Sequence, residues 1–228
     1  LLGCPVRIAN DANCFALAEA LSGRGRQVRA SKVEVEPGHE YPDTVFGVIL
    51  GTGVGGGVVV NGKLLTGPNA IAGEWGHNPM PLQSGTLSQD NVDRRVCYCG
   101  RVNCVETFLS GQGMLSRFLA LDPNIKNTDS AEHVIQLLRH NDFRAQNYFQ
   151  QYLDQLGRSL ASVINILDPE IMVFGGGLSN IDELYPALHR VTLPHVFSDT
   201  LSTKFEKARY GDSSGVRGAA WLGRKLLY

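Results

Sequence analysis

Three cysteines and one upstream histidine constrain the fold of this chain more than any other feature of its sequence. Cys97, Cys99 and Cys104 follow a C-x-C-x4-C spacing, and His77 lies upstream of them. Three thiols and one imidazole are the four ligands that a closed tetrahedral zinc site uses. The pattern therefore predicts a structural zinc site that ties the segment around His77 to a cysteine knuckle.

Two carboxylates stand next to these ligands in the sequence. Glu74 precedes His77 by about one helical turn, and Glu106 follows shortly after Cys104. A single metal ion would therefore fix the positions of both carboxylates. Two positioned carboxylates can bind the hydroxyl groups of a polyol.

The composition excludes several classes of partner. The chain has 228 residues, of which 43% are apolar, and it carries 21 basic against 22 acidic side chains for a net charge of −1. This balance provides no general attraction for nucleic acid or for an anionic membrane, and no apolar run approaches the roughly 20 residues that cross a bilayer. With three of the five cysteines assigned to zinc, only Cys4 and Cys14 remain, which favours a reducing, cytoplasmic location.

A glycine-rich segment follows an apolar run that begins at Val45 and has the character of a strand. The pattern predicts a strand, a glycine turn, a second strand, a hairpin at Asn61-Gly62 and a third strand. The glycines match G-x-G-x-x-G, but no helix follows them, which excludes a dinucleotide-binding fold, and no Lys-Ser or Lys-Thr closes a P-loop. A hairpin that binds phosphate through its backbone N–H groups and the Thr52 hydroxyl is the favoured interpretation, and a tight hairpin without a ligand is the alternative. The residues of this predicted clamp are Gly51, Thr52, Gly53, Gly55, Gly56 and Gly57.

The remaining elements follow from apolar spacing and from helix start and stop signals. We expect strand character at 6–8 and 171–174. Helices are expected at 15–21, 131–138, 143–167 and 215–222, with a further helical segment from 106 and a helix capped near Ser179 or Asn180. Between them we expect a turn at 10–13, a loop at 22–42 and a polar surface flap at 83–95. A second glycine run lies at Gly175, Gly176 and Gly177. It provides either a bare surface for a purine ring or only a strand-to-helix turn.

Taken together, these motifs resemble the ROK family (repressor, open reading frame, kinase) of bacterial sugar kinases. The motifs that carry the resemblance occur in the family's order along the whole chain: Asn10-Asp11-Ala12-Asn13-Cys14, Leu50 to Gly57, Glu74-Trp75-Gly76-His77, the cysteine knuckle, and Asp168-Pro169 before the Gly175 triplet. The resemblance implies an α/β protein with the actin-like or hexokinase ATPase (ribonuclease H-like) fold, a mixed sheet flanked by helices. It implies a lobe remnant at 1–44, a larger lobe at 45–210, and a C-terminal helix at 211–228 that packs back on the smaller lobe.

The resemblance also implies roles for individual residues. Asp11 would be the catalytic base, and the sugar hydroxyls would be held by Asn10, Glu74, His77 and Glu106. The Gly51 to Gly57 segment would contact the phosphates of ATP, and Gly175 to Gly177 would flank the adenosine. Mg²⁺ would accompany ATP, zinc would be structural, and His77 would bind zinc with one ring nitrogen and face the sugar with the other. A homodimer is implied by the resemblance alone.

The resemblance leaves the substrate open. The sequences after Glu-Trp-Gly-His and around the knuckle look most like the fructokinase or mannofructokinase branch, which predicts phosphorylation of fructose at the 6-hydroxyl. The N-acetylglucosamine kinase branch is the close alternative, glucokinase is another, and a sugar-responsive repressor that lacks its DNA-binding segment here is the alternative class. The family's first phosphate loop, Asp-x-Gly-Gly-Thr, is not in the sequence. We therefore expect that a first lobe is not represented and that the chain by itself is not a competent kinase.

Overall fold

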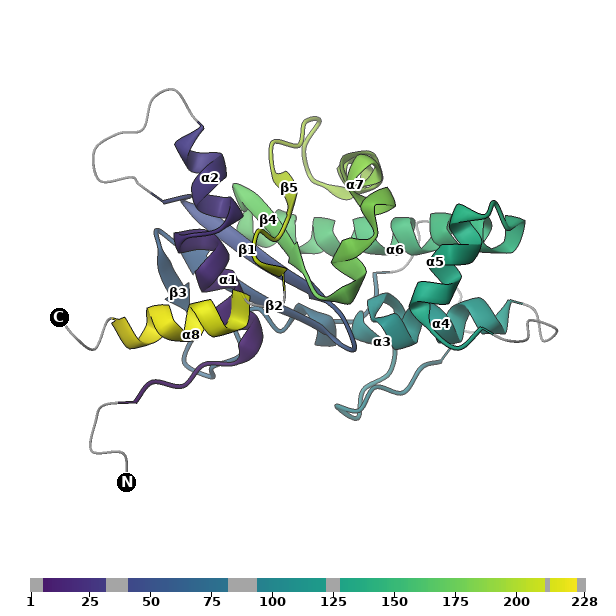
Figure 1. Ribbon diagram of the computed structural model, residues 1–228, viewed down its shortest axis with the longest axis horizontal. Coiled ribbons are helices and arrows are strands. Elements are labelled where there is room, and N and C mark those ends of the chain that lie inside the picture. The colour runs from purple at the N-terminus through teal and green to yellow at the C-terminus, as the bar shows by residue number, and fades with distance from the viewer. Residues whose placement is uncertain (1–5, 32–40, 82–93, 122–127, 212–213, 225–228) are drawn as a thin grey trace.

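A five-stranded mixed sheet forms the centre of the molecule (Figure 1). The structure is a computed structural model, and it describes residues 6–31, 41–81, 94–121, 128–211 and 214–224. The strands, in the spatial order β3-β2-β1-β4-β5, are β3 (Lys63–Leu65), β2 (Val54–Val60), β1 (Thr44–Leu50), β4 (Ile171–Gly175) and β5 (Lys204–Lys207). The helices are α1 (Asp11–Leu21), α2 (Arg24–Ala30), α3 (Glu106–Leu109), α4 (Gly111–Ala120), α5 (Ala131–Arg139), α6 (Phe143–Leu167), α7 (Tyr185–Thr192) and α8 (Ser214–Arg224).

The strand directions bring both glycine runs to one edge of the sheet. β1 pairs antiparallel with β2 and parallel with β4, and Ile49 lies opposite Gly175. The carboxyl ends of the parallel neighbours β1 and β4 therefore meet, and a glycine segment follows each of them. Ligands of open α/β sheets bind at such carboxyl ends.

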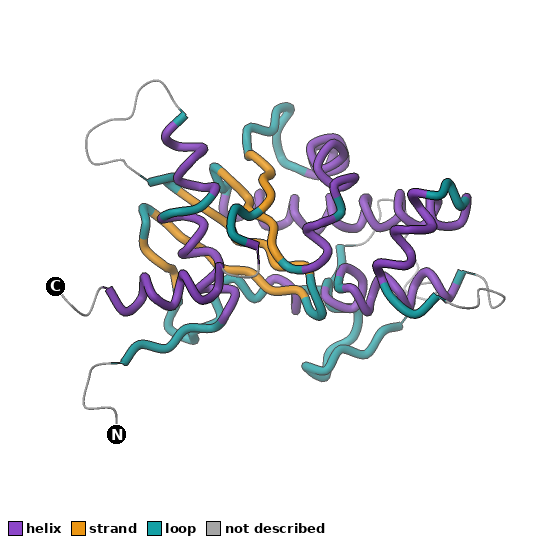
Figure 2. Tube along the Cα trace, in the orientation of Figure 1, coloured by secondary structure: helices purple, strands orange, loops and turns teal. Residues whose placement is uncertain are grey.

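Both faces of the sheet are covered by helices (Figure 2). Alternate residues of β1 point to opposite faces, so that Phe46, Val48 and Leu50 join the core that contains α6, while Val45 joins the core that contains α1. β1 is accordingly buried over most of its length. The predicted strands at Val45 and at 171–174 are confirmed.

The predicted long helix at 143–167 is confirmed as α6. Asp142 caps its start by accepting hydrogen bonds from the N–H groups of Arg144 and Ala145, and Asp168, with a φ of +41°, ends it before Pro169. Its buried residues include the apolar positions that recur at helical spacing: Leu153, Leu156, Leu160 and Ile164. The helices predicted at 131–138 and 215–222 are confirmed as α5 and α8.

Two predictions near the N-terminus are wrong. Residues 6–8 form no strand, and Ile8 is 94% exposed, because no strand among the described residues lies next to them. Within the turn predicted at 10–13, residues 11–13 belong to the first turn of α1, and Asn10 caps this helix by accepting a hydrogen bond from Asn13 N at 2.7 Å.

Part of the loop predicted at 22–42 is helix α2. Its Val28 side chain is buried in the same core as α1, so that packing outweighs a polar local sequence. Residues 32–40 of this loop, and most of the flap predicted at 83–95, lie outside the described residues.

The segment after the Gly175 triplet also differs from its prediction. Two short 3-10 helices, Gly177–Asn180 and Asp182–Leu184, precede α7. The Ser179 hydroxyl does not cap α7; it donates to Gly176 O at 2.7 Å, and the Tyr185 hydroxyl donates to Ser179 O. β5 also had no counterpart in the sequence-based prediction.

A buried carboxylate joins α1 to the segment that leads into α8. Glu19 is fully buried and accepts hydrogen bonds from Arg24 N at 2.8 Å, Arg209 N at 3.2 Å, Tyr210 N at 3.4 Å and the Ser214 hydroxyl at 2.8 Å. We call this arrangement the Glu19 joint. It links α1, the start of α2 and the start of α8 through one side chain.

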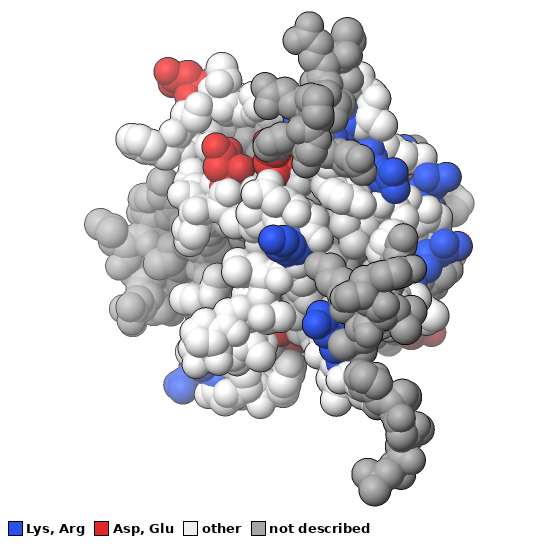
Figure 3. All heavy atoms as spheres, turned by 90° about the vertical axis from the view of Figure 1, so that its left-hand side faces the viewer, with Lys and Arg blue, Asp and Glu red and all other residues white. Residues whose placement is uncertain are grey.

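The end of the molecule that carries α1 and α8 has a mixed surface charge. Figure 3 shows that Lys and Arg lie on this face apart from one another, with uncharged surface between them and a few acidic side chains. This pattern agrees with the net charge of −1. Among the described residues, no helix is both long enough and apolar enough to span a bilayer.

Candidate functional site

The four predicted zinc ligands lie together. The ligand atoms of His77, Cys97, Cys99 and Cys104 are all within 4.8 Å of one another. His77 Nδ1 is 3.6 Å from Cys97 Sγ, and Cys99 Sγ is 3.7 Å from Cys104 Sγ. A tetrahedral ion with ordinary zinc bond lengths places a nitrogen and a sulfur ligand about 3.6 Å apart and two sulfur ligands about 3.8 Å apart. The residues therefore fit a zinc ion, with His77 binding through Nδ1.

Short backbone contacts build this cluster. Cys97 N donates to Arg101 O, and Gly100 N donates to Cys97 O, which makes the tight turn between the first cysteines. Gly100 has a φ of +85°, a conformation that favours glycine. An isolated bridge between Pro79 and Cys104 then brings the segment after His77 onto the knuckle.

The thiols themselves favour a bound cation. Burial, together with the neighbouring Cys99 and Cys97, raises the pKa of Cys104 to about 12. The pKa of the Cys99 thiol is lowered, chiefly because the backbone N–H of Arg101 stabilises the thiolate. A cation at the centre of the cluster would offset the burial and the mutual repulsion of the thiolates.

The predicted sugar-binding residues form a connected line that starts at α1. Asn10 donates through Nδ2 to Glu74 Oε1 at 3.0 Å while its own Oδ1 caps the helix. Asp11 is the exposed first residue of α1, and Glu74 precedes the short 3-10 turn Trp75–His77. The structure therefore brings Asn10 next to Glu74, and through that turn connects both to the metal ligand His77.

Glu106 connects the knuckle to the sheet. Its Oε2 accepts a hydrogen bond from Val54 N at 2.9 Å, and its Oε1 lies 3.9 Å from Cys97 Sγ. A Cβ at Gly53 would come within 2.6 Å of Oε2. The carboxylate is thus held between the metal cluster and the first residue of β2, as its sequence position predicted.

The glycines of the predicted phosphate clamp have two different structural roles. Only residues 51–53 form the turn, because β2 begins at Val54 and includes Gly55, Gly56 and Gly57. A Cβ at Gly57 would come within 2.8 Å of Ala12 O, and one at Gly56 within 2.8 Å of Gly73 O. The glycine turn is therefore shorter than the glycine-rich segment 51–57 from which it was predicted, since close packing of protein backbone accounts for Gly56 and Gly57.

The first glycine turn and the second glycine run lie against each other. The Cβ position at Gly51 is 3.9 Å from Gly176 Cα and from Gly177 N. Gly176 has a φ of +80°, and a Cβ there would come within 2.5 Å of Leu50 O. Gly111 N, at the start of α4, donates to Gly51 O at 2.8 Å. Bare backbone from three segments thus surrounds one point at the carboxyl edge of the sheet.

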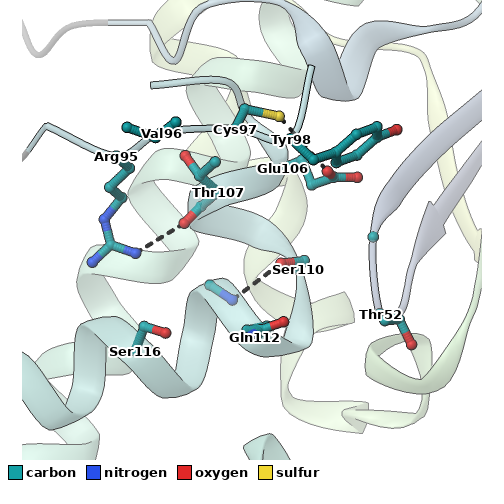
Figure 4. A pocket seen from close by; sticks show the side chains of 12 residues that line it. Thr52, Arg95, Val96, Cys97, Tyr98, Glu106, Thr107, Ser110, Gln112 and Ser116 are labelled. Carbon is teal, nitrogen blue, oxygen red and sulfur yellow. Dashed lines mark hydrogen bonds between the residues drawn. The ribbon is translucent and has the colours of Figure 1, made fainter. Parts of the chain in front are cut away.

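A cavity of about 640 Å³ connects this glycine turn with the knuckle (Figure 4). Its lining includes Thr52 and Gly53 from the turn, Tyr98 and Glu106 near the metal cluster, and Ser110 at the cap of α4. Polar and apolar groups share this lining about equally. A polar ligand of the size of a sugar or nucleotide fits such a volume.

Sequence reasoning did not single out Tyr98 as a site residue. Its hydroxyl lies 2.9 Å from His77 Nε2, and the two rings make an edge-to-face contact at 5.1 Å. The sequence feature that could have identified Tyr98 is its position between the metal ligands Cys97 and Cys99, because a side chain at this position lies beside the metal site. Ser110, whose hydroxyl caps α4 by accepting from Gly113 N at 3.0 Å, was also missed.

Comparisons with known proteins give a consistent result. Residues 1–225 match the ROK family. The chain is 37% identical over 222 residues to an N-acetyl-D-glucosamine kinase of Yersinia enterocolitica. This aligned region covers 97% of this chain and 68% of that protein. The chain thus spans about two thirds of the length of this curated relative.

Solved structures include both enzymes and a regulator. A ROK hexokinase from Thermus thermophilus has a TM-score of 0.75 at 26% identity, over 97% of this chain and 66% of its own. A ROK family transcriptional regulator, a homolog of the E. coli MLC protein, has a TM-score of 0.75 at 26% identity, over 99% of this chain and 53% of its own.

Proposed function

Because the chain belongs to the ROK family, we propose that it is part of an ATP-dependent kinase that phosphorylates N-acetylglucosamine at its 6-hydroxyl. The observation that carries the reaction is the cavity that runs from the first glycine turn, at Thr52 and Gly53, to Glu106 beside the metal cluster. The relatives named N-acetyl-D-glucosamine kinase support the sugar. They favour this alternative over the fructokinase branch that the sequence around the knuckle indicated.

The fold agrees with this family. The match to the ROK hexokinase confirms the predicted actin-like fold with its mixed sheet and flanking helices. In such a fold the parallel strand ends carry the phosphate-binding turns, which is where Gly51 and Gly176 meet. ATP would lie along this edge with Mg²⁺ neutralising its phosphates.

The proposed mechanism assigns a separate task to each part of the site. The sugar hydroxyls are held by Asn10, Glu74, His77 and Glu106, and Asp11 faces the 6-hydroxyl from the start of α1. As the sugar oxygen bonds to the γ-phosphorus, the bond from that phosphorus to the bridging oxygen breaks and ADP leaves. Asp11 accepts the hydroxyl proton late in this step, since phosphoryl transfer depends more on positioning than on a strong base.

Zinc has a structural task in this proposal. When bound, it fixes His77 and the knuckle, and through Cys97 and the short segment to Glu106 it orients that carboxylate. The chain's own residues do all the sugar binding. Loss of the ion is therefore expected to weaken sugar binding before it affects the sheet.

A coupled assay of ADP release tests the reaction. The full-length protein is given Mg-ATP with N-acetylglucosamine, glucose, mannose or fructose in turn, and we expect the highest kcat/KM with N-acetylglucosamine. Asp11→Asn should lower kcat by about 10²- to 10⁴-fold and leave the sugar Kd nearly unchanged, with Asp129→Asn on the surface as the matched control. An Asp11→Asn protein that keeps most of its activity would exclude Asp11 as the base.

The same assay separates the alternatives. Preference for fructose would return the substrate to the fructokinase branch. Sugar binding without any turnover would favour a sugar-responsive regulator, the class of the structure that matches 99% of this chain. The kinase proposal is supported over that class by the two glycine segments, both of which are present and adjacent.

A further inference from the structure

The short helix α3 is attached to the metal cluster at its start. Val105 N donates to Asn78 O at 2.9 Å, which ties the residue before the helix to the residue after His77. The Thr107 hydroxyl donates to the backbone oxygen of the metal ligand Cys104 at 2.7 Å. The start of α3 is therefore fixed relative to both segments that carry the zinc ligands.

The remainder of α3 is anchored in the core. Phe108 and Leu109 are buried in the same cluster as α6. The Tyr152 hydroxyl, from the middle of α6, donates to Leu109 O at 2.9 Å. A side chain on α3 therefore extends from a backbone that the metal cluster and the core hold together.

The segment that contains α3 holds both ends of the first glycine turn. Where the turn leads into β2, Glu106 Oε2 accepts a hydrogen bond from Val54 N at 2.9 Å. Where the turn leaves β1, Gly111 N, at the start of α4, donates to Gly51 O at 2.8 Å. Gly51 N donates to Gly53 O at 2.9 Å and closes the turn. A segment anchored at the metal cluster thus sets the conformation of this turn.

The turn offers free hydrogen-bond donors to the cavity. Thr52 is exposed, and together with Gly53 and Glu106 it lines the cavity of about 640 Å³ (Figure 4). The N–H groups of Thr52 and Gly53 donate to no other group within the part of the chain that the structure describes. Successive backbone N–H groups in a turn form an anion-binding site. The orientation of these two donors depends on the contacts with Glu106 and Gly111.

The charge of Glu106 does not suit direct contact with phosphate. A carboxylate beside a phosphate repels it, yet Oε2 of this carboxylate is bonded to a backbone N–H next to the turn. A Cβ at Gly53 would come within 2.6 Å of the same oxygen, so the turn and the carboxylate pack closely. The contact can therefore assist a nucleotide only through the shape that it gives to the turn.

We propose that Glu106 is a positioning residue for the nucleotide, in addition to its proposed contact with the sugar. Its Oε2 and the Gly111 N–H hold the two ends of the glycine turn, so that the N–H groups of Thr52 and Gly53 face the phosphates of ATP. The metal cluster is thereby connected to the nucleotide site as well as to the sugar site. This inference rests on the proposed function, and it adds a structural link between the two substrate sites.

Calorimetry with the full-length protein tests the inference without turnover and without sugar. The dissociation constant of the magnesium complex of a non-hydrolysable ATP analogue is measured for wild type, Glu106→Ala and Glu106→Gln. Glu106→Ala removes the acceptor for Val54 N and should weaken binding of the analogue about 10-fold. Glu106→Gln keeps a side-chain oxygen for Val54 N, so the analogue should bind no more than about 2-fold more weakly than to wild type.

The other end of the turn provides a matched pair of variants at Gly111. Proline is favoured at the first position of a helix, and Ser110 already has the extended backbone, with φ of −72° and ψ of 165°, that a residue before proline adopts. Gly111→Pro removes the N–H that Gly51 O accepts and should weaken binding of the analogue about 5-fold. Gly111→Ala also adds a Cβ but keeps this N–H, and it should change the affinity by less than about 2-fold.

Zinc content, circular dichroism and the affinity for N-acetylglucosamine are measured in parallel. The inference is supported if Glu106→Ala and Gly111→Pro lose nucleotide affinity at full zinc content, while Glu106→Gln and Gly111→Ala keep it. It is overturned if Glu106→Ala binds the analogue as tightly as wild type, or if Glu106→Gln loses as much affinity as Glu106→Ala.

The sugar affinity separates a local effect from a general one. Gly111→Pro should leave the affinity for N-acetylglucosamine within about 2-fold of wild type. Equal losses of sugar and nucleotide affinity in this variant would overturn the inference, because they would indicate a general loss of structure. If Gly111→Pro does not fold, the two Glu106 variants decide. A wild-type protein that binds no ATP analogue overturns the proposed function itself.

Discussion

The cysteine knuckle and the Glu19 joint both hold distant segments together through polar groups, but they do so in opposite ways. The knuckle gathers three thiols and an imidazole, the ligand set of a zinc ion, and burial together with the neighbouring thiols raises the pKa of Cys104. The Glu19 joint places one carboxylate among three N–H groups and a hydroxyl, which satisfy it without any ion. The first region therefore depends on metal, and the second depends only on the chain.

Their positions match this difference. The knuckle stands at the surface, where Val96 and Tyr98 are largely exposed. Glu19 is fully buried beneath α2 and α8. A region that binds a small ligand needs accessible groups, whereas a region that only joins elements is more stable when it is closed to water.

Removal of a metal ligand should have the largest effect. Cys104→Ala takes one buried thiol from the cluster, and because structural zinc sites contribute on the order of 10 kcal/mol, we expect zinc content to fall from about one ion per chain to nearly none. Elemental analysis after gel filtration measures this change. Cys14→Ala, at a buried thiol of α1 outside the cluster, is the control that should keep its zinc. Full retention of zinc by Cys104→Ala would contradict the ligand set.

The next largest effect is expected at the Glu19 joint. Glu19→Ala leaves buried N–H groups and the Ser214 hydroxyl without their acceptor, which should lower the free energy of unfolding by about 3 to 5 kcal/mol. Urea denaturation measures this change in the free energy of unfolding, and the zinc content of Glu19→Ala should equal that of the wild type. Glu132→Ala, at an exposed position of α5, should change stability by no more than about 0.5 kcal/mol. An equally small effect of Glu19→Ala would mean that the joint contributes nothing.

A substitution in α8 tests how closely this helix packs on α1. A Cβ at Gly218 would overlap the carbonyl oxygen of Cys14, whereas Gly215 faces open space. Gly218→Ala should therefore destabilise the protein by about 1 to 3 kcal/mol. Gly215→Ala should stabilise it by about 0.5 kcal/mol, since alanine favours helix. Thermal unfolding of both variants distinguishes local packing from a general intolerance of α8 to substitution.

The smallest effect is expected at a surface ion pair outside both regions. Arg139 Nε lies 2.7 Å from Glu183 Oε1, and this contact lowers the pKa of Glu183. A lowered folded-state pKa gives stability that is present above the unfolded pKa and is lost as pH falls through the folded value. Arg139→Ala should thus cost less than about 1 kcal/mol at neutral pH, because both side chains are substantially exposed. Urea denaturation at pH 7 and below about pH 4 should show this cost disappearing, and a pH-independent cost would assign it to packing.

The sequence predicted those parts of the molecule that local patterns determine. Apolar spacing and capping residues predicted both ends of α6. The spacing of four ligand residues predicted the metal cluster. It could not show that Gly56 and Gly57 serve contacts with Ala12 and Gly73, because a glycine needed for packing and a glycine needed for a ligand look alike in a sequence.

Other features depend on contacts between distant segments. Nothing local marks α2 as a helix, since its packing against α1 and its contact with Glu19 stabilise it. The 3-10 turns after Gly176 and the placement of Tyr98 against His77 likewise depend on neighbours that are remote in sequence. The predicted roles of Asp11, Asn10, Glu74 and Glu106 in sugar binding remain predictions that the contacts among them support.

The most direct test of the account is the sugar affinity of the wild-type protein before and after zinc removal. N-acetylglucosamine binding is measured by calorimetry on the zinc-loaded protein, on protein stripped with a chelator, and after zinc is restored, with circular dichroism as a check on the fold. The account predicts that stripping weakens sugar binding at least about 10-fold, that the sheet and α1 stay folded, and that zinc restores the affinity. Unchanged sugar affinity in folded, zinc-free protein would contradict the claim that the metal cluster organises the binding site.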